Sequence, residues 1–584
     1  MGCFNSSAML KHRLILVFLV LACFSCTLWN GFSADDNFLF VNNSFYYNPS
    51  NIIRVFQPGY NIVPDNVLYG SAQDKGTGSV AYRPVTTMSF FVDSLVWKNR
   101  PWGYHLTSML LHLFNVLLLY EIVIMMATPQ IALIAAVIFS IHPANTEPVI
   151  AIGYRSDLLV GSFLLIALWA WLIFRQKGLL SWAVIACAAY FLALFSKETA
   201  LLFPLAVLFF DRVNFKKTCQ PKGAWEYALF LGAALFYLYI YWHVFPNTAF
   251  NTLGAMGQGW QDYVSIFIQI MALYLKEIFF VLSAGIMPPL YWPLPRPIIS
   301  LPIILQGLIV IGTTGFLLFY ICRRYKYSWA AVWCVIFFLP VMAFWVNPNP
   351  VALRYMYVPF AGIAFLVAVG LVQIWDRWEA RVSAGLRFFI CIAAILALAL
   401  PAIASNLSWR NNFSLGEAWV KGYPEHYKGY FFKATEFLRL GKVKEAADNF
   451  KLALKDSRCD QLLSNYYFGI SCLILGRLDE ARNAFEEILR QEPASYRGHA
   501  GLGDYYYLSK QYPKAVLYLE KVLPVNYNDE TALKLLVSLH HAEGPAGVAR
   551  GLEVIGKILG KGPRLKKIDE FARTLSAASG SVNP

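Results

Sequence analysis

The apolar run LILVFLVLACFSCTLWNGF at residues 14–32 is followed almost at once by the acidic pair Asp35–Asp36. The run is long enough to cross a bilayer as a helix. Two carboxylates beside hydrocarbon are costly to place without a use. Lys11–Arg13 precede the run, and positive charge favours the cytoplasmic side. The stretch therefore predicts a retained membrane span, with the two carboxylates on the extracytoplasmic face of the membrane.

The apolar character of this first run recurs along most of the chain. Of 584 residues, 58% are hydrophobic and 14% charged, unlike a soluble globular domain. Apolar runs up to about residue 405 predict about eleven transmembrane helices, with the N-terminus cytoplasmic and the C-terminal part extracytoplasmic. The net charge of +14 lies largely in short loops, where it orients the spans and does not indicate nucleic acid. The predicted spans are about 14–32, 104–126, 130–141, 158–174, 180–195, 199–210, 224–245, 299–321, 329–346, 356–375 and 386–404.

Two stretches of the membrane part stand apart from these spans. Residues 33–102 form a long first outer loop, a length that is uncommon unless the loop is functional. Residues 246–298 contain the apolar run 263–285, and if that run crossed the membrane the basic residues at 323–326 would lie outside. We therefore predict that 263–285 is re-entrant or lies along the outer interface.

A repeat begins after the last span. Gly469 and Gly503 lie 34 residues apart, and each is followed twelve residues later by an alanine. That period and those residue types are typical of tetratricopeptide repeats, whose helix pairs pack through small residues. We predict two domains, a transmembrane domain at 1–408 and an α-solenoid of tetratricopeptide repeats at 409–584. A degenerate unit or capping helices would occupy 530–575, and a plain helical bundle is the alternative.

Most of the unusual polar residues fall on the outer side once the spans are placed. Ionisable groups near a membrane face tend to line a cavity or a ligand path. Each alone could belong to a structural ion pair, but their convergence on the side of the acidic pair favours a site. The set comprises Asp35, Asp36, Arg83, His105, His142, Glu147, Arg155, Asp157, Lys197, Glu198, Arg354 and Tyr355.

Carboxylates beside cations suit the transfer of a phosphate-linked group. One carboxylate can act as general base on an acceptor hydroxyl or amide. Guanidinium groups such as Arg83, Arg155 and Arg354 bind phosphate oxygens and stabilise a phosphate leaving group. In a membrane, a polyprenyl-phosphate sugar fits such a site, because its tail lies in the bilayer and its head at the surface. The ten cysteines form no metal-binding or disulfide pattern, and dependence on a divalent metal stays open.

Several motifs, in a fixed order along the chain, resemble those of a known family. They are Asp35-Asp36, YRPVTT at 82–87, HPANTEPV at 142–149, YRSDL at 154–158, FSKE at 195–198 and LRYMYVP at 353–359. The chain resembles the GT-C membrane glycosyltransferases, and most closely the transmembrane-and-tetratricopeptide-repeat (TMTC) O-mannosyltransferases. It departs from the family pattern at Tyr154, where glycine is usual, and at Asn145, where a second histidine is common.

This resemblance implies roles for the polar residues. An inverting transferase would use Asp35 as the base, with Asp36 supporting it or binding substrate. Arg83 would contact the donor phosphate. The remaining residues that we predict to bind donor phosphate or substrate are His142, Glu147, Arg155, Asp157, Lys197, Glu198, Arg354 and Tyr355.

We therefore predict a glycosyltransferase that moves a sugar from a lipid-phosphate donor to a protein held by the repeats, on the extracytoplasmic face. Two alternatives stay open: a transferase or ligase acting on a lipid-linked glycan or surface polysaccharide, and a non-catalytic membrane scaffold. A transporter is disfavoured, because the polar residues gather at one face and not along a midplane path. The chain is short beside eukaryotic members of the family, which favours a prokaryotic cytoplasmic membrane over the endoplasmic reticulum.

Overall fold

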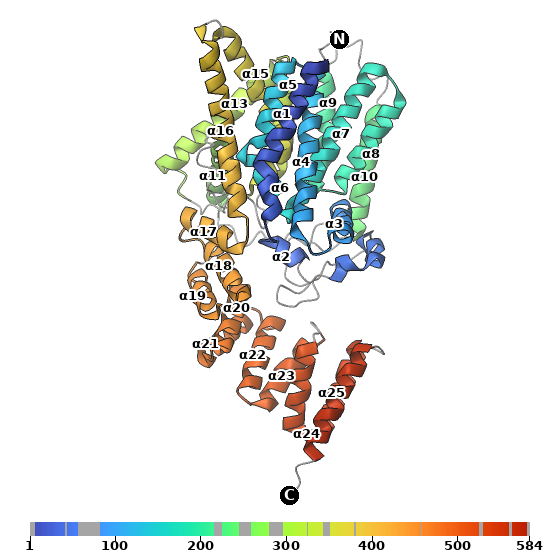
Figure 1. Cartoon of the computed structure of the whole chain (residues 1–584), viewed down its shortest axis with the longest axis vertical. Helices are drawn as coiled ribbons and strands as arrows, with labels where there is room; N and C mark the ends of the chain where they lie inside the picture. The colour runs from blue at the N-terminus through green and yellow to red at the C-terminus, as the bar shows by residue number, and fades with distance from the viewer. Residues whose placement is uncertain are drawn as a thin grey trace. The chain divides into compact units, whose positions relative to one another are not determined.

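Every element in the described part of the chain is a helix, which confirms the predicted all-α fold (Figure 1). The computed structural model describes residues 6–40, 44–56, 82–214, 225–244, 259–279, 296–323, 325–342, 351–378, 381–456, 458–524, 529–559 and 563–580. The described residues up to Asn411 form one compact unit, and those from Asn412 onward form a second.

Among the described residues of the first unit, six helical segments are long and apolar enough to cross a membrane. They are α1 with η1 (Ser6–Trp29), α4 (Pro101–Ile124), η7 with α7 (Ile152–Lys177), α13 (Leu301–Cys322), η12 with α15 (Leu353–Trp378) and α16 (Ala384–Ser408). The pair α5 (Pro129–Ile141) and η6–α6 (Pro143–Ile150), bent by 58°, makes a seventh if it counts as one span. The remaining helices of the unit that bear on the count are α8 (Leu180–Leu194), α9 (Phe203–Asn214), α10 (Trp225–Val244), α11 (Trp260–Phe279) and α14 (Ser328–Met342).

The predicted total of about eleven spans stays a prediction. The helices α8, α9 and α14 have 15, 12 and 15 residues, fewer than the roughly 20 that a bilayer core requires. The first part of the run 263–285 forms helix α11, and its part from 280 on lies outside the described residues. Its predicted re-entrant or interfacial placement also stays a prediction.

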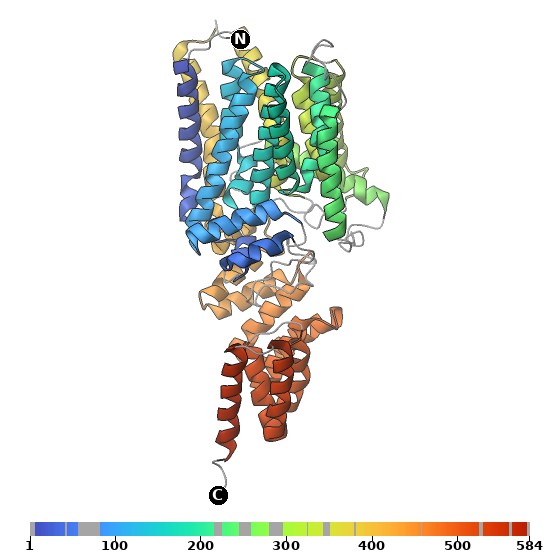
Figure 2. The ribbon, with the colours of Figure 1, turned by 90° about the vertical axis from the view of Figure 1, so that its right-hand side faces the viewer.

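The long helices of this unit run alongside one another (Figures 1 and 2). Helix α4 packs on α5 and α7, α7 packs on α8, and α15 packs on α5 and α14. Inside the bundle, the Tyr357 hydroxyl lies 2.9 Å from His112 Nδ1 and accepts a hydrogen bond from Asn115 at 3.0 Å. These polar contacts join α4 to α15 among apolar side chains, where an unpaired polar group would be costly.

The stretch 33–102, predicted as a loop, contains helices. Short helix α2 (Asp35–Phe40) carries the two aspartates in its first turn, where carboxylates suit the positive end of the helix dipole. The 3₁₀ helices η2 (Ser44–Tyr47) and η3 (Pro49–Phe56) follow. Helix α3 (Pro84–Trp97) starts with a proline in its first turn, a favoured position because no amide donor is lost there. Residues 57–81 of the stretch lie outside the described part.

The second unit is a series of antiparallel helix pairs. Its helices are α17 (Asn412–Gly422), α18 (Tyr427–Arg439), α19 (Val443–Ala453), α20 (Gln461–Ile474), α21 (Leu478–Gln491), α22 (Tyr496–Leu508), α23 (Tyr512–Val522), α24 (Asp529–Leu559) and α25 (Pro563–Gly580). Helix α24 is bent at Gly544, so it divides into two parts. Each helix packs on the next along the series, as a solenoid requires.

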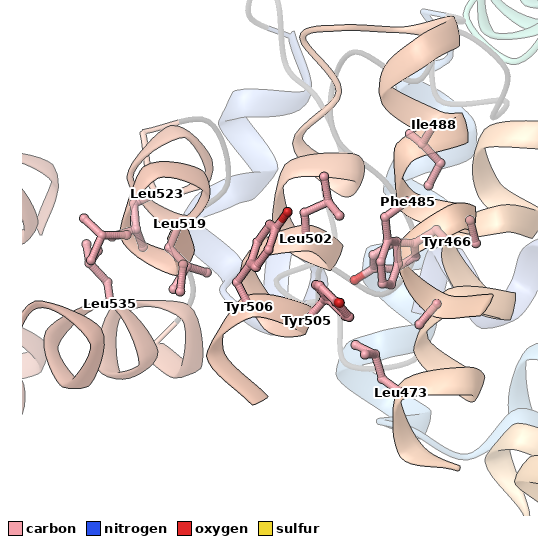
Figure 3. Packing of buried hydrophobic residues seen from close by; sticks show 14 of the residues in the cluster. Tyr466, Leu473, Phe485, Ile488, Leu502, Tyr505, Tyr506, Leu519, Leu523 and Leu535 are labelled. Carbon is pink, nitrogen blue, oxygen red and sulfur yellow. The ribbon is translucent and has the colours of Figure 1, made fainter. Parts of the chain in front are cut away.

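One continuous apolar core runs through these repeats (Figure 3). Phe485 of α21 lies between α20 and α22 and is fully buried. A Cβ atom at Gly469 would come within 2.5 Å of the Phe485 ring. The close contact between α20 and α21 therefore requires glycine at position 469, since any side chain there would push the two helices apart.

We expect Gly469→Val to destabilise the repeat unit by about 1–3 kcal/mol, because it overpacks the contact with Phe485. Lys444→Val, at an exposed position of α19, is the control and should change little. Thermal unfolding of the full chain in detergent, followed by circular dichroism, measures both. Equal melting profiles for the two variants would contradict this account of the close helix contact.

Candidate active site

Asp36 joins the start of α2 to η7 (Ile152–Tyr154), which directly precedes α7. Its buried carboxylate accepts hydrogen bonds from the backbone N–H groups of Ile152, at 3.3 Å, and Gly153, at 2.6 Å. A Cβ atom at position 153 would lie 3.3 Å from the Asp36 oxygen, so glycine allows this approach. The preceding Ala34 has a φ of 48°, a region that costs a non-glycine residue about 1–2 kcal/mol. The two hydrogen bonds of Asp36 help to hold this strained turn.

Burial also changes the acidity of Asp36. It raises the pKa of this carboxyl to about 7; the negative charge of Asp35 adds to the rise, and the N–H donors of Gly153 and Ile152 oppose it. Asp36 therefore changes its charge near neutral pH.

Asp35 faces the other way and is exposed. Successive residues of a helix point about 100° apart, so the two adjacent carboxylates cannot share one environment. The Tyr154 hydroxyl donates a hydrogen bond to Asp35 Oδ2 at 3.0 Å. This contact links the exposed carboxylate to a group of charged side chains.

We call that group the charged cluster, and it consists of three ion pairs joined by two tyrosines. Arg354 binds Glu147 at 2.6 Å, Lys197 binds Asp157 at 2.5 Å, and Arg83 binds Glu198 at 2.7 Å. The Arg354 guanidinium lies 3.9 Å from the centre of the Tyr154 ring and 4.9 Å from that of Tyr355. The Lys197 ammonium lies 5.0 Å from the same Tyr355 ring. One series of contacts thus runs from Asp35 through the tyrosines to the cations Arg354 and Lys197. Arg83 belongs to the same group because it pairs with Glu198, the residue that follows Lys197 in the sequence.

The ends of several helices bring the cluster together. Glu147 lies on α6, Asp157 in the first turn of α7, and Lys197 directly before η8 (Glu198–Leu202). Two hydrogen bonds from neighbouring residues hold Arg83 near η8, since the Val85 N–H donates to Phe195 O and the Thr86 hydroxyl donates to Ser196 O. The short helices α6 and η8 lie here between longer helices. This arrangement lets side chains from distant parts of the sequence meet.

Arg83 and Glu198 form the more open pair of the cluster. Their side chains are 26% and 48% exposed, whereas Lys197 and Asp157 are each 5% exposed. The protein around Glu198 removes part of its water and so opposes ionisation, but the charge of Arg83 outweighs this effect and lowers the pKa of Glu198 to about 2. Burial works against the charged form of Arg83 too, yet Glu198, with Asp157 and Tyr355, raises the pKa of Arg83 above its usual value. The pair therefore stays ionised across the physiological range.

Three sequence-predicted residues lie apart from the charged cluster. The fully buried Arg155 pairs with Asp93 of α3 at 2.5 Å and donates to Tyr104 O at 2.9 Å. His142 Nε2 lies 3.2 Å from Ile278 O, and its ring lies 4.5 Å from that of Phe360. His105 Nε2 lies 3.4 Å from Gly31 O. In this arrangement the three side chains brace the helices, and a role for Arg155 and His142 in binding donor or substrate stays a prediction.

Two residues near the site escaped the sequence reasoning. Asp93 is buried and accepts from Thr107 at 2.7 Å in addition to pairing with Arg155. It is the sole charged residue in the string 84–97, which is a signal that could have identified it. The Tyr274 hydroxyl of α11 lies 3.1 Å from Ala352 O and so supports η12, which carries Arg354. A tyrosine in an apolar helix gives no comparable signal.

Within the described residues, no three His, Cys, Asp or Glu side chains lie together as a metal site requires. The two aspartates diverge, and the nearby Glu147, Asp157 and Glu198 each hold a cation.

Comparison with known proteins connects this arrangement to one class of membrane enzyme. Residues 90–242 match the family model of the dolichyl-phosphate-mannose-protein mannosyltransferases, and residues 473–539 match a tetratricopeptide-repeat model. The chain is thus a helical membrane protein with tetratricopeptide repeats that is similar to protein mannosyltransferases.

The curated relatives name the group more closely. Human protein O-mannosyl-transferase TMTC3 is 26% identical over 32% of this chain and 19% of its own length. Xenopus laevis protein O-mannosyl-transferase tmtc2 is 30% identical over 28% of this chain and 21% of its own length. The predicted resemblance to the TMTC group is confirmed, and the chain spans about a fifth of these relatives.

A solved structure matches more of the chain, at a lower sequence identity. The Archaeoglobus fulgidus oligosaccharyltransferase tethered with an acceptor peptide has a TM-score of 0.41 and 12% identity, covering 76% of this chain and 59% of that one.

We expect Asp93→Leu to destabilise the membrane unit by about 3–5 kcal/mol, because it leaves the buried Arg155 charge without its partner. The double variant Asp93→Leu/Arg155→Met removes both charges and should recover much of that loss. Thermal unfolding in detergent compares the two with the unchanged chain. A double variant as unstable as the single one would contradict the role of the ion pair.

Proposed function

We propose that this protein is a glycosyltransferase that moves a sugar from a polyprenyl-phosphate donor to a hydroxyl of a protein acceptor. The observation that carries the proposal is the series of contacts from exposed Asp35 through Tyr154 to Arg354 and the other cations. It puts a carboxylate that can accept a proton beside cations that can hold a phosphate. The match to a dolichyl-phosphate-mannose-protein mannosyltransferase model supports the donor class.

Asp35 is the better candidate for the general base. Its carboxylate is exposed, whereas the Asp36 carboxylate is buried and accepts two backbone N–H bonds. A base must reach the proton that it removes. Asp36 and the hydroxyl of Tyr154 would instead hold the turn and the Asp35 side chain in place.

In the proposed step, Asp35 takes the proton of the acceptor hydroxyl while the oxygen attacks the anomeric carbon of the sugar. The bond between that carbon and the phosphate oxygen breaks, and the polyprenyl phosphate leaves with the electron pair. Attack opposite the leaving group inverts the anomeric configuration. The guanidinium of Arg83, with 26% of the side chain exposed, would stabilise the charge on the departing phosphate.

The acceptor is proposed to be a protein because tetratricopeptide repeats follow the membrane unit. Stacked helix pairs form surfaces that bind peptides or proteins. The named relatives are protein O-mannosyltransferases, which supports the same acceptor class. Placement of the site on the extracytoplasmic face rests on loop charges, and the sugar itself is left open.

Asp35→Asn should lower sugar transfer about 10²–10⁴-fold, because the amide cannot take the acceptor proton. Transfer from a radiolabelled polyprenyl-phosphate sugar to protein, in proteoliposomes, measures the loss. Asp448→Asn, at an exposed position of α19, is the matched control with unchanged transfer. Unaltered transfer by the Asp35 variant would refute its assignment as the base.

The pH profile should report on Asp36. Below a pH of about 7 its carboxyl gains a proton and accepts the two N–H bonds more weakly, so transfer should fall as the pH drops through that value. Asp36→Asn removes this titration and should flatten the acidic part of the profile, at a lower overall rate. An acidic limb that persists near pH 7 in this variant would assign the titration to another group.

Deletion of residues 420–584 separates a protein acceptor from a glycan acceptor. A protein glycosyltransferase should lose selection among acceptor proteins, whereas an enzyme acting on a lipid-linked glycan would keep its activity. Glycoproteomics of cells with the full and the shortened chain measures the difference. An unchanged set of glycosylated proteins would contradict acceptor binding by the repeats.

A further inference from the structure

The end of helix α16 is tied to the end of the first helix of the chain. Helix α16 packs on α1 and η1 (Ser25–Trp29), and Figure 1 shows α1 and α16 ending on the side of the unit that carries α2. The buried Asn406 amide donates to Cys26 Sγ at 2.9 Å, and the Asn30 amide donates to Asn406 Oδ1 at 3.1 Å. These hydrogen bonds fix where α16 ends relative to the stretch that leads into the acidic pair.

A backbone hydrogen bond continues this tie beyond both helices. The Gly31 N–H donates to Arg410 O at 3.0 Å. Gly31 lies four residues before Asp35, and Arg410 directly follows Trp409. The residues just after α16 therefore lie beside the segment that carries Asp35.

Trp409, the residue that ends α16, packs on the tyrosine that contacts Asp35. It is 4% exposed, and its ring centre lies 6.5 Å from that of Tyr154, with the two ring planes at 84°. Near-perpendicular aromatic rings at this distance attract one another beyond the effect of burial alone. The same Tyr154 donates its hydroxyl to Asp35 at 3.0 Å and has the Arg354 guanidinium 3.9 Å from its ring centre.

Of these three neighbours of Tyr154, Trp409 is the uncharged one. Tyr154 is the last of the three residues of η7, a single turn, so its own helix cannot fix its ring. Asp36 holds the backbone of that turn through the N–H groups of Ile152 and Gly153. The tyrosine ring needs a separate support, because Asp35 and Arg354 are the groups that a substrate would engage.

We propose that Trp409 is a positioning residue for sugar transfer. It fixes the ring of Tyr154, so that the hydroxyl stays on Asp35 and the ring face stays against Arg354. Trp409 acts through Tyr154 and does not contact the substrate. The importance of Asp35 in this inference rests on the proposed function, whereas the support of the tyrosine ring can be measured without it.

Nitration by tetranitromethane tests the support of Tyr154 in the full chain in detergent, with mass spectrometry of the Tyr154 peptide as the readout. Trp409→Leu should nitrate Tyr154 about three- to tenfold faster, because the ring loses its aromatic neighbour. Trp409→Phe keeps an aromatic ring and should stay within about twofold of the unchanged chain. Trp329→Leu is the control, because this 5% exposed tryptophan of α14 packs on Phe210 and Phe365, and it should not change the rate.

An unchanged nitration rate of Tyr154 in Trp409→Leu would overturn the proposal. Tyr190 of α8 is fully buried and serves as the internal reference. An equal rise at Tyr190 would overturn the proposal too, because Trp409 would then support the whole unit and not one ring.

A cycle of single and double variants tests the consequence for transfer in proteoliposomes. Trp409→Leu should lower kcat about three- to tenfold, and Tyr154→Leu about tenfold or more. The double variant should be no slower than Tyr154→Leu alone, because Trp409 then has no ring to position. Trp329→Leu combined with Tyr154→Leu should instead multiply the two single effects. Multiplied effects for Trp409 and Tyr154 would show that they act separately and would refute the positioning role.

The two measurements separate this inference from the proposed function. Absence of transfer by the unchanged chain would refute the proposed function, and the nitration rates would still decide whether Trp409 fixes Tyr154. Transfer by the unchanged chain together with an unchanged nitration rate in Trp409→Leu would refute the inference and leave the proposed function standing.

Discussion

A charge placed between apolar helices has to find a partner of opposite sign, and much of the membrane unit is arranged around this requirement. Isolated charges in a medium of low dielectric constant are strongly disfavoured, and breaking one partner of a buried pair is far more costly than losing a surface pair. The pairs Arg155–Asp93 and Lys197–Asp157 have side chains no more than 5% exposed. Each joins two segments that are distant in the sequence, so pairing fixes which helix ends meet.

The candidate site follows from the same requirement. The cations that could bind a phosphate are held by carboxylates on neighbouring elements and by the rings of Tyr154 and Tyr355. Groups fixed in this way need little rearrangement when charge develops during a reaction, which is where electrostatic catalysis gains most. Asp36 serves the same end differently, since its carboxylate holds a strained backbone turn from which Asp35 points outward.

The sequence predicted the features that depend on composition and period. Apolar runs gave the all-α membrane unit, and the spacing of Gly469 and Gly503 gave the repeats. The convergence of charged residues such as Glu147 and Arg354 followed from span direction. The partner of each charge did not, because Arg155 lies two residues from Asp157 in sequence yet pairs with Asp93 in space. Helix α3 was also missed. Its exposed side is apolar, so its sequence lacks the periodic change between apolar and polar residues that identifies a helix with one buried side.

The proposed division of labour between Asp35 and Asp36 depends on structure and not on sequence. The two residues are chemically identical and adjacent, so no sequence pattern separates a base from a supporting group. Helix geometry separates them by direction, and the loss of water around Asp36 then separates their chemistry. The same reasoning bears on donor binding. Arg83 is paired with Glu198, so if Arg83 binds the donor phosphate as proposed, the phosphate would share the guanidinium with that carboxylate or displace it. Glu198 would then favour release of the lipid phosphate after transfer, because it could pair with the guanidinium again as the proposed donor departs.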